Sequence, residues 1–154
     1  MKPGDLVPDF ELPDQTGTPR KLSEFLASGP VVLYFYPAAM TPGCTAESCH
    51  FRDLKSEFEA VGAQRVGISA DQVDKQKKFA DKYSFDFPLL SDPDATVANL
   101  FGVHRNLSFI PTKRTTFVIG TDSRIIDVIK SEIRMGVHAD KALDVLRARA
   151  DTGA

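Results

Sequence analysis

The sequence predicts an α/β fold in which helices cover both faces of a mixed central sheet. Three observations lead to this prediction. Short apolar runs bounded by turn residues alternate with longer amphipathic segments. The run from Pro30 to Tyr36 is almost wholly apolar, as expected of a buried central strand. Near the end of the chain, Thr115 to Ile119 and Arg124 to Ile129 flank a polar turn and are typical of a hairpin.

The first half of the chain gives four elements in order. Asp9 to Leu12 is a short strand candidate, and Ser23 is a residue type that caps helices, here before Glu24 to Ala27. The strand Pro30 to Tyr36 follows. Residues 42–61 then carry an apolar stripe at helical spacing, which predicts one long helix.

The second half continues the alternation. We expect a buried strand, a charged helix with an apolar inner face, a short strand, a short helix that ends at Gly102, the hairpin, and a final amphipathic helix. Before the hairpin these elements span Arg65 to Ser69, Asp71 to Tyr83, Pro88 to Leu90 and Ala95 to Phe101, and the last helix spans Asp140 to Arg149.

A late hairpin after βαβ units, behind a short N-terminal extension, favours a thioredoxin-like topology. Composition alone does not separate this topology from a flavodoxin-like sheet. At 154 residues the chain is expected to be a single domain over residues 1–154.

Composition narrows the classes of function. The formal charge is −2 and the basic residues are scattered, which argues against a nucleic-acid or anionic-membrane partner. The N-terminal segment MKPGDLVPDFELPD has prolines and acids where a signal peptide needs an apolar core. The longest apolar run, residues 31–40, is shorter than the roughly 20 residues of a spanning helix. We expect a soluble, cytoplasmic protein.

The only two cysteines follow the central strand closely. Thr41 is a good N-cap type and Pro42 suits the first helical position, which puts Cys44 in the first turn of a helix. Free backbone N–H groups and the helix dipole favour a thiolate there, and Gly43 leaves room for a small substrate. A lone cysteine is most often a small buried hydrophobe, but this placement and the nearby Cys49 indicate a nucleophile.

The spacing of Cys44 and Cys49 restricts what the pair can do. On an intact helix, five residues give a rise of about 7.5 Å and a turn of about 140°. The two Cα atoms would then lie roughly 8 to 9 Å apart, whereas a disulfide joins Cα atoms about 4.4 to 6.8 Å apart. The cysteines therefore either form no disulfide or require a helix that unwinds during the reaction.

At these residues the sequence resembles a known family. The spacing of Pro37, Thr41 and Cys44 is that of the peroxiredoxin active-site signature. The surrounding YFYPAAMTPGCTAESCHFRD is similar to the subgroup called PrxQ or bacterioferritin-comigratory protein. GDLVPDFELPDQTG and KRTTFVIGTDSRI resemble flanking segments of the family, so the resemblance covers most of the chain.

The resemblance implies a thiol-dependent peroxidase that reduces hydrogen peroxide and organic hydroperoxides, with no metal or organic cofactor. Cys44 would be the peroxidatic cysteine, whose thiolate attacks the peroxide and becomes a sulfenic acid. Cys49 would be the resolving cysteine and would form a disulfide within one chain, an atypical 2-Cys arrangement. A thioredoxin-like donor would then reduce that disulfide.

The same resemblance assigns roles to four more residues. Thr41 would hydrogen-bond the thiolate or the peroxide, and Pro37 would shield the pocket from water. Arg114 matches the family arginine that stabilises the thiolate and the departing oxygen, which suits its permanent charge and several donors. Glu47 matches the acid that orients this arginine. Without the resemblance, Arg114 reads as a surface residue and Glu47 as an ordinary first-turn acid.

The segment Ala38-Ala39-Met40 departs from the subgroup, which carries charged or polar residues there. A more apolar rim would favour lipid-like hydroperoxides or form a partner contact, and the sequence does not rank these. A monomer suffices for an intramolecular disulfide, whereas exposure of Met40 and Phe109 would permit a homodimer.

Two other classes remain open. A thioredoxin-like thiol–disulfide exchange protein would share the fold, although the Cys-x-x-Cys spacing is absent. A copper-delivery protein would need two cysteines and a histidine, but His50, His104 and His138 show no ligand-like spacing. A surface or core role is the simpler interpretation of each histidine.

Overall fold

The computed structural model describes residues 1–105 and 112–151 and has an α/β fold. The strands are β1 (Glu11–Pro13), β2 (Pro19–Lys21), β3 (Val31–Phe35), β4 (Gln64–Ser69), β5 (Leu89–Ser91), β6 (Thr115–Ile119) and β7 (Ile125–Lys130). The helices are α1 (Leu22–Leu26), α2 (Pro42–Asp53), α3 (Lys55–Ala60), α4 (Val73–Tyr83), α5 (Thr96–Phe101) and α6 (Val137–Asp151).

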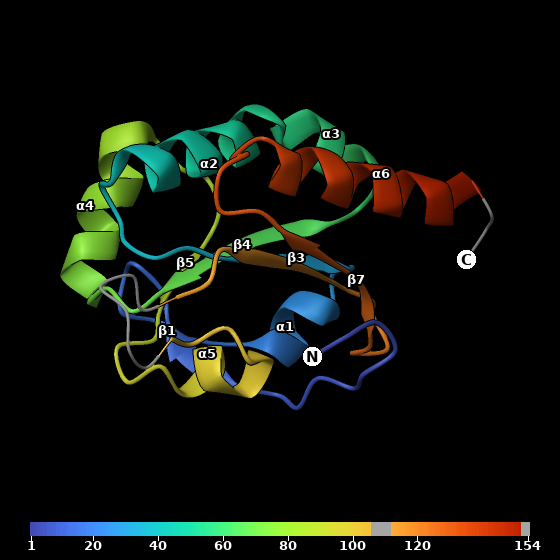
Figure 1. Ribbon diagram of the computed structural model, residues 1–154, viewed down its shortest axis with the longest axis horizontal. Coiled ribbons are helices and arrows are strands. Elements are labelled where there is room, and N and C mark those ends of the chain that lie inside the picture. The colour runs from blue at the N-terminus through green and yellow to red at the C-terminus, as the bar shows by residue number, and fades with distance from the viewer. Residues whose placement is uncertain (106–111, 152–154) are drawn as a thin grey trace.

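The central sheet is mixed, with strand order β5-β4-β3-β6-β7. Strands β3, β4 and β5 run parallel, while β6 runs antiparallel to both β3 and β7. Helices α2, α3, α4 and α6 cover one face of this sheet, and α1 and α5 cover the other (Figure 1). The predicted thioredoxin-like class is therefore confirmed, with the hairpin β6–β7 at one side of the sheet.

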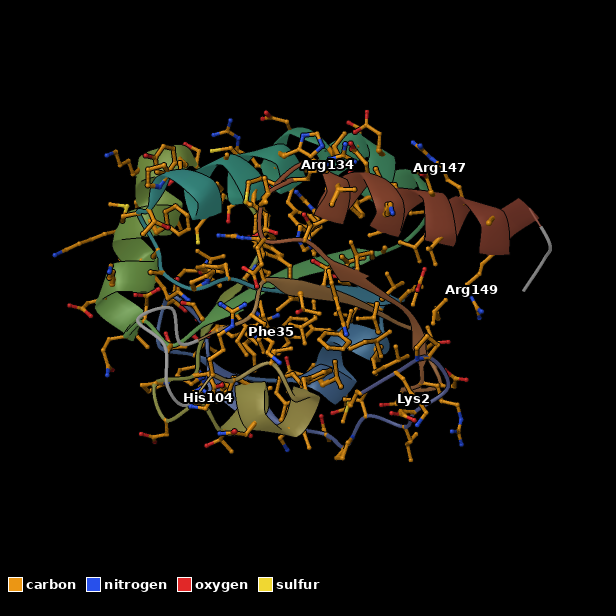
Figure 2. All side chains as sticks on the ribbon, viewed as in Figure 1. Lys2, Phe35, His104, Arg134, Arg147 and Arg149 are labelled. Atoms are coloured by element: carbon orange, nitrogen blue, oxygen red, sulfur yellow. The ribbon has the colours of Figure 1, made fainter. Side chains whose placement is uncertain are left out.

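Strand β3 divides the core because its side chains alternate between the two faces. Val31, Leu33 and Phe35 pack toward α1 and α5, whereas Val32 and Tyr34 pack toward α2, α4 and α6. Figure 2 shows Phe35 in the interior of the molecule, and it is buried. The run that looked uniformly apolar in the sequence thus supplies both halves of the core, as a central strand must.

Tyr34 fixes α2 against the sheet. Its ring stacks on Phe51 of α2, with the ring centroids 4.3 Å apart. Its buried hydroxyl donates a hydrogen bond of 2.9 Å to Ser48 Oγ on the same helix. These contacts hold the helix that carries both cysteines at a fixed place over β3.

The long helix predicted over residues 42–61 is two helices. Leu54 ends α2 and precedes α3 with φ −93° and ψ 21°, which are not α-helical values. Leu54 packs against the core on the sheet face that α2 covers. Hydrophobic periodicity continues across the junction, so the pattern in the sequence could not reveal it.

The two ends of the chain also differ from the prediction. Residues 11–13 and 19–21 form an antiparallel hairpin, of which only the first strand was expected. Helix α1 begins before Ser23, and Ser23 donates its hydroxyl and its N–H to the carboxylate of Asp9 instead of capping a helix. Helix α6 begins at Val137, three residues earlier than predicted.

Within residues 1–105 and 112–151, none of the helices has the length and apolar character needed to cross a bilayer. Phe109, one of the two residues considered for a subunit contact, lies outside the described residues.

Candidate active site

The segment after β3 presents Cys44 in the first turn of α2, as predicted. Thr41 is the N-cap residue in an extended conformation, and Pro42 opens the helix. The Thr41 carbonyl accepts the N–H of Thr45 at 2.9 Å. The Thr41 hydroxyl instead donates to the carbonyl of Ala38 at 2.7 Å and caps no helix N–H. Thr41 is therefore a backbone cap here, and its contact with a thiolate or peroxide stays a prediction.

Asp71, which lies just after the end of β4, binds the turn that leads into α2. Asp71 Oδ2 accepts the backbone N–H of Ala39 at 2.7 Å and the hydroxyl of Ser69 at the same distance. Met40 follows with φ +70°, a left-handed conformation that side chains other than glycine adopt rarely. Ala39 is buried and Met40 is exposed, so of this pair only Met40 contributes to the surface.

Arg114 joins the start of α2 to the start of β6. It lies directly before β6, it is buried, and its guanidinium makes two contacts. Arg114 Nη2 lies 3.1 Å from Cys44 Sγ, and Arg114 Nη1 donates to Glu47 Oε1 at 2.6 Å. Cys44 and Glu47 are both fully buried and lie almost one turn apart on α2. Arg114 is thus in direct contact with Cys44 and with Glu47, the two residues that the family resemblance placed in one site with it.

The charges in this contact affect one another strongly. Burial raises the pKa of Glu47 to about 8, although Arg114 opposes the shift. Burial acts to lower the pKa of Arg114, but the negative charges of Glu47 and Cys44 outweigh it and raise the pKa above its ordinary value. Arg114 therefore remains a cation, and its guanidinium can stabilise negative charge on the Cys44 sulfur or on an oxygen beside it.

Gly43 lies close against Arg114. A Cβ atom at Gly43 would lie 3.3 Å from Arg114 Nη2 and 3.5 Å from Met135 Sδ. The first of these distances is tighter than ordinary van der Waals contact, so a side chain would press on the guanidinium. The sequence argument assigned Gly43 to the approach of substrate, and the structure adds the approach of Arg114.

The remaining predicted residues lie close by in the chain. Pro37 follows β3 and is half-buried, and its shielding role stays a prediction. Cys49 is half-buried, lies on α2 with Cys44, and both thiols are free. Burial raises the pKa of the Cys49 thiol, which disfavours its thiolate while α2 is intact.

The core role that the sequence analysis allowed for His138 is confirmed, because this residue of α6 is fully buried. Its position beside Glu47 was not predicted from the sequence. The signal was present, because His138, Ala142 and Leu146 repeat at a spacing of four and all three are buried. The predicted helix began at Asp140, so this stripe was cut off before its first member. Asp71 was missed because its role depends on a contact 32 residues away.

Comparisons with known proteins agree with this geometry. A family model described as the AhpC/TSA family matches residues 3–128. The crystal structure of peroxidoxin BcpB from Mycobacterium tuberculosis has a TM-score of 0.93 and 66% identity, and the match covers 96% of this chain and 97% of that one. Peroxiredoxin Bcp of Escherichia coli (strain K12) is 39% identical over 155 residues, 97% of this chain and 98% of its own.

A further solved structure is that of the bacterioferritin comigratory protein of Xanthomonas campestris, a protein with alkyl peroxide reduction activity. It has a TM-score of 0.83 and 32% identity, and the match covers 92% of each chain. The chain therefore belongs to the AhpC/TSA family, and these relatives, which it matches along nearly its whole length, include peroxiredoxins.

Proposed function

We propose that this chain is a thiol peroxidase in which Cys44 attacks a peroxide. The observation that carries the proposal is the 3.1 Å contact between Arg114 Nη2 and Cys44 Sγ at the start of a helix. The guanidinium and the helix N-terminus both favour negative charge on sulfur. Peroxiredoxin Bcp and BcpB, which share 39% and 66% of their residues with this chain, support the same reaction class.

In the proposed reaction the Cys44 thiolate forms a bond to one peroxide oxygen while the O–O bond breaks. The peroxide's own proton passes to the second oxygen, which leaves as water or an alcohol, and sulfur is oxidised to a sulfenate that takes up one proton from solvent to give the sulfenic acid. Negative charge develops on the departing oxygen, so a donor fixed beside the sulfur is most effective at that moment. Arg114 is held in that place by Glu47. Thr41 and Pro37 complete the proposed pocket.

The proposed substrates are hydrogen peroxide and organic hydroperoxides. The alkyl peroxide activity of the Xanthomonas relative supports the second class. The apolar surface contributed by the segment after Pro37 is smaller than its sequence implies, because Ala39 is buried and its N–H is bound to Asp71. Met40, with 40% of its surface exposed, remains as an apolar side chain there.

We propose that Cys49 resolves the sulfenic acid. Its thiol would attack the Cys44 sulfur, form the disulfide, and release the oxygen as water. Both cysteines lie on the regular helix α2, so their Cα atoms are about 8 to 9 Å apart by helix geometry. This separation exceeds the range of a disulfide. The proposed cycle therefore includes unwinding of α2.

A thioredoxin-like protein is the proposed reductant of that disulfide. Because resolution uses two cysteines of one chain, the proposal requires only a monomer. We propose that the protein is a single domain over residues 1–154. We also propose that it acts in the cytoplasm, because the reducing environment there keeps both thiols free between turnovers.

The test compares the wild type with Cys44→Ser and Cys49→Ser in thioredoxin-coupled consumption of hydrogen peroxide and an alkyl hydroperoxide. We expect no activity from Cys44→Ser. We expect Cys49→Ser to consume about one equivalent of peroxide and then stop, because its sulfenic acid cannot be resolved within the chain. Wild-type turnover by Cys44→Ser would refute the function. Peptide mapping after one equivalent should find a Cys44–Cys49 bond within one chain.

A further inference from the structure

Helix α6 places His138 beside Glu47, next to the carboxylate oxygen that Arg114 does not bind. His138 is the second residue of α6, and none of its surface is exposed, whereas His50 and His104 are partly exposed. Its ring lies on the side of Glu47 that Arg114 does not occupy. Arg114 takes Glu47 Oε1, and His138 Nε2 lies 3.7 Å from Glu47 Oε2.

Two hydrogen bonds fix the ring and its proton. His138 Nε2 lies 2.8 Å from the carbonyl oxygen of Ser131, and a carbonyl only accepts, so Nε2 carries the hydrogen. His138 Nδ1 lies 2.8 Å from the hydroxyl of Thr116 and, in the neutral ring, accepts its hydrogen. Burial lowers the pKa of His138, and so does the charge of Arg114, which agrees with a neutral ring.

The second carboxylate oxygen of Glu47, Oε2, is buried next to the His138 ring. Among the described residues, this buried oxygen has no hydrogen-bond partner. His138 Nε2, whose hydrogen goes to the Ser131 carbonyl, lies 3.7 Å from this oxygen, which is longer than a hydrogen bond. The polar N–H edge of the buried ring is therefore the neighbour of the acid's free oxygen, while Arg114 holds the other oxygen.

Thr116 connects the ring to the same strand that positions Arg114. Thr116 lies two residues after Arg114, so the two side chains lie on one face of the chain at β6. Arg114 reaches Cys44 from this face, and Thr116 holds His138 on it. Strand β6 and helix α6 thus support the acid from two sides.

We propose that His138 is a positioning residue: its neutral imidazole holds Glu47 against Arg114, and through this pair keeps the guanidinium on the Cys44 sulfur. The inference rests on the proposed peroxidase function, and it assigns His138 no contact with the peroxide. A histidine that only filled the core would have its effect through stability and not through Glu47.

The test uses a matched pair of variants. His138→Leu removes the N–H and keeps an apolar side chain, whereas His138→Gln keeps an N–H donor of similar reach. We expect His138→Leu to lower the second-order rate constant for hydrogen peroxide about tenfold, and His138→Gln to stay within about threefold of the wild type. Equal rates for wild type and His138→Leu, or an equal loss in both variants, would overturn the assignment.

A double-mutant cycle separates positioning from packing. If His138 acts through Glu47, then His138→Leu added to Glu47→Gln should change the rate less than about twofold. The same tenfold loss in both backgrounds would show that Glu47 is not involved. Leu143→Ala on α6 serves as the packing control: it should lower the melting temperature and leave the rate constant unchanged, and a comparable rate loss would contradict the proposal.

Nitrogen-15 NMR of the histidine rings tests the geometry without any peroxide. The reduced wild type should show His138 as the neutral Nε2–H tautomer. An Nδ1–H tautomer would overturn the inference even in an active enzyme. If the wild type did not react with peroxide, the proposed function would fail while this spectrum still reported on His138.

Discussion

Replacing Arg114 by lysine tests the geometry of the site most directly, because lysine keeps the positive charge and lacks the forked guanidinium with its two terminal nitrogens. The guanidinium spans two partners, with Nη1 2.6 Å from Glu47 and Nη2 3.1 Å from Cys44. A single ammonium on a flexible stem cannot hold both positions. A hydrogen bond to a charged group contributes about 1.5–3 kcal/mol, so losing one of the two should slow the reaction with peroxide by roughly 10- to 150-fold.

The rate constant is measured by competition with a haem peroxidase, because the chain has no tryptophan to report the reaction by fluorescence. Arg20→Lys is the matched control, since Arg20 pairs with Asp14 on the β1–β2 hairpin at 3.2 Å and should not affect the rate. Wild-type rates for Arg114→Lys would show that the fork contributes nothing to the reaction. A fall in the rate constant no larger than that of Arg20→Lys would also show that the forked guanidinium of Arg114 contributes nothing.

Three further predictions follow from named contacts. Gly43→Ala places a methyl group 3.3 Å from Arg114 Nη2, so we expect a rate loss of about three- to tenfold with an unchanged circular dichroism spectrum; an unchanged rate would refute the packing argument. The folded-state pKa of Glu47 is raised to about 8, so the folded protein keeps a proton that the unfolded chain releases above pH 4.5. In urea unfolding, the free energy of unfolding of the wild type should therefore fall by a few kcal/mol relative to that of Glu47→Gln between pH 5 and 8. Parallel pH dependences of the two proteins would contradict this. After one equivalent of peroxide, amide hydrogen exchange over residues 42–50 should accelerate, and equal protection in reduced and disulfide-bonded protein would exclude unwinding of α2.

Much of the fold was predictable because local patterns and tertiary structure agree. The apolar run through Val32 and Tyr34 is short and bounded by turn residues, which favours a buried strand, and the run is buried on both faces. Thr41 and Pro42 marked the start of α2 to the residue, because cap preferences depend on a few neighbouring positions. The break at Leu54 has no such local marker.

The site was predictable where a motif brought its members together. Cys44, Glu47 and Arg114 were placed in one site by family resemblance, since 70 residues separate Cys44 from Arg114 and no local pattern joins them. His138 belongs to no motif, and its role depends on how α6 packs on α2. Asp71 likewise acts on a turn that only the folded sheet brings near. Contacts of this kind are fixed by tertiary packing and not by spacing.

The break between α2 and α3 at Leu54 limits how much buried surface becomes exposed when the disulfide forms and α2 unwinds. Helices melt cooperatively, and here α2 can open over its 12 residues while α3 stays anchored by the buried Phe58. Opening would take Phe51 out of its stack between Tyr34 and Phe58, whose centroids lie 4.3 and 5.8 Å away. An apolar surface would then exist in the disulfide form and be absent from the dithiol form. A reductant that binds this surface would dock on the spent enzyme and release it once the helix re-forms.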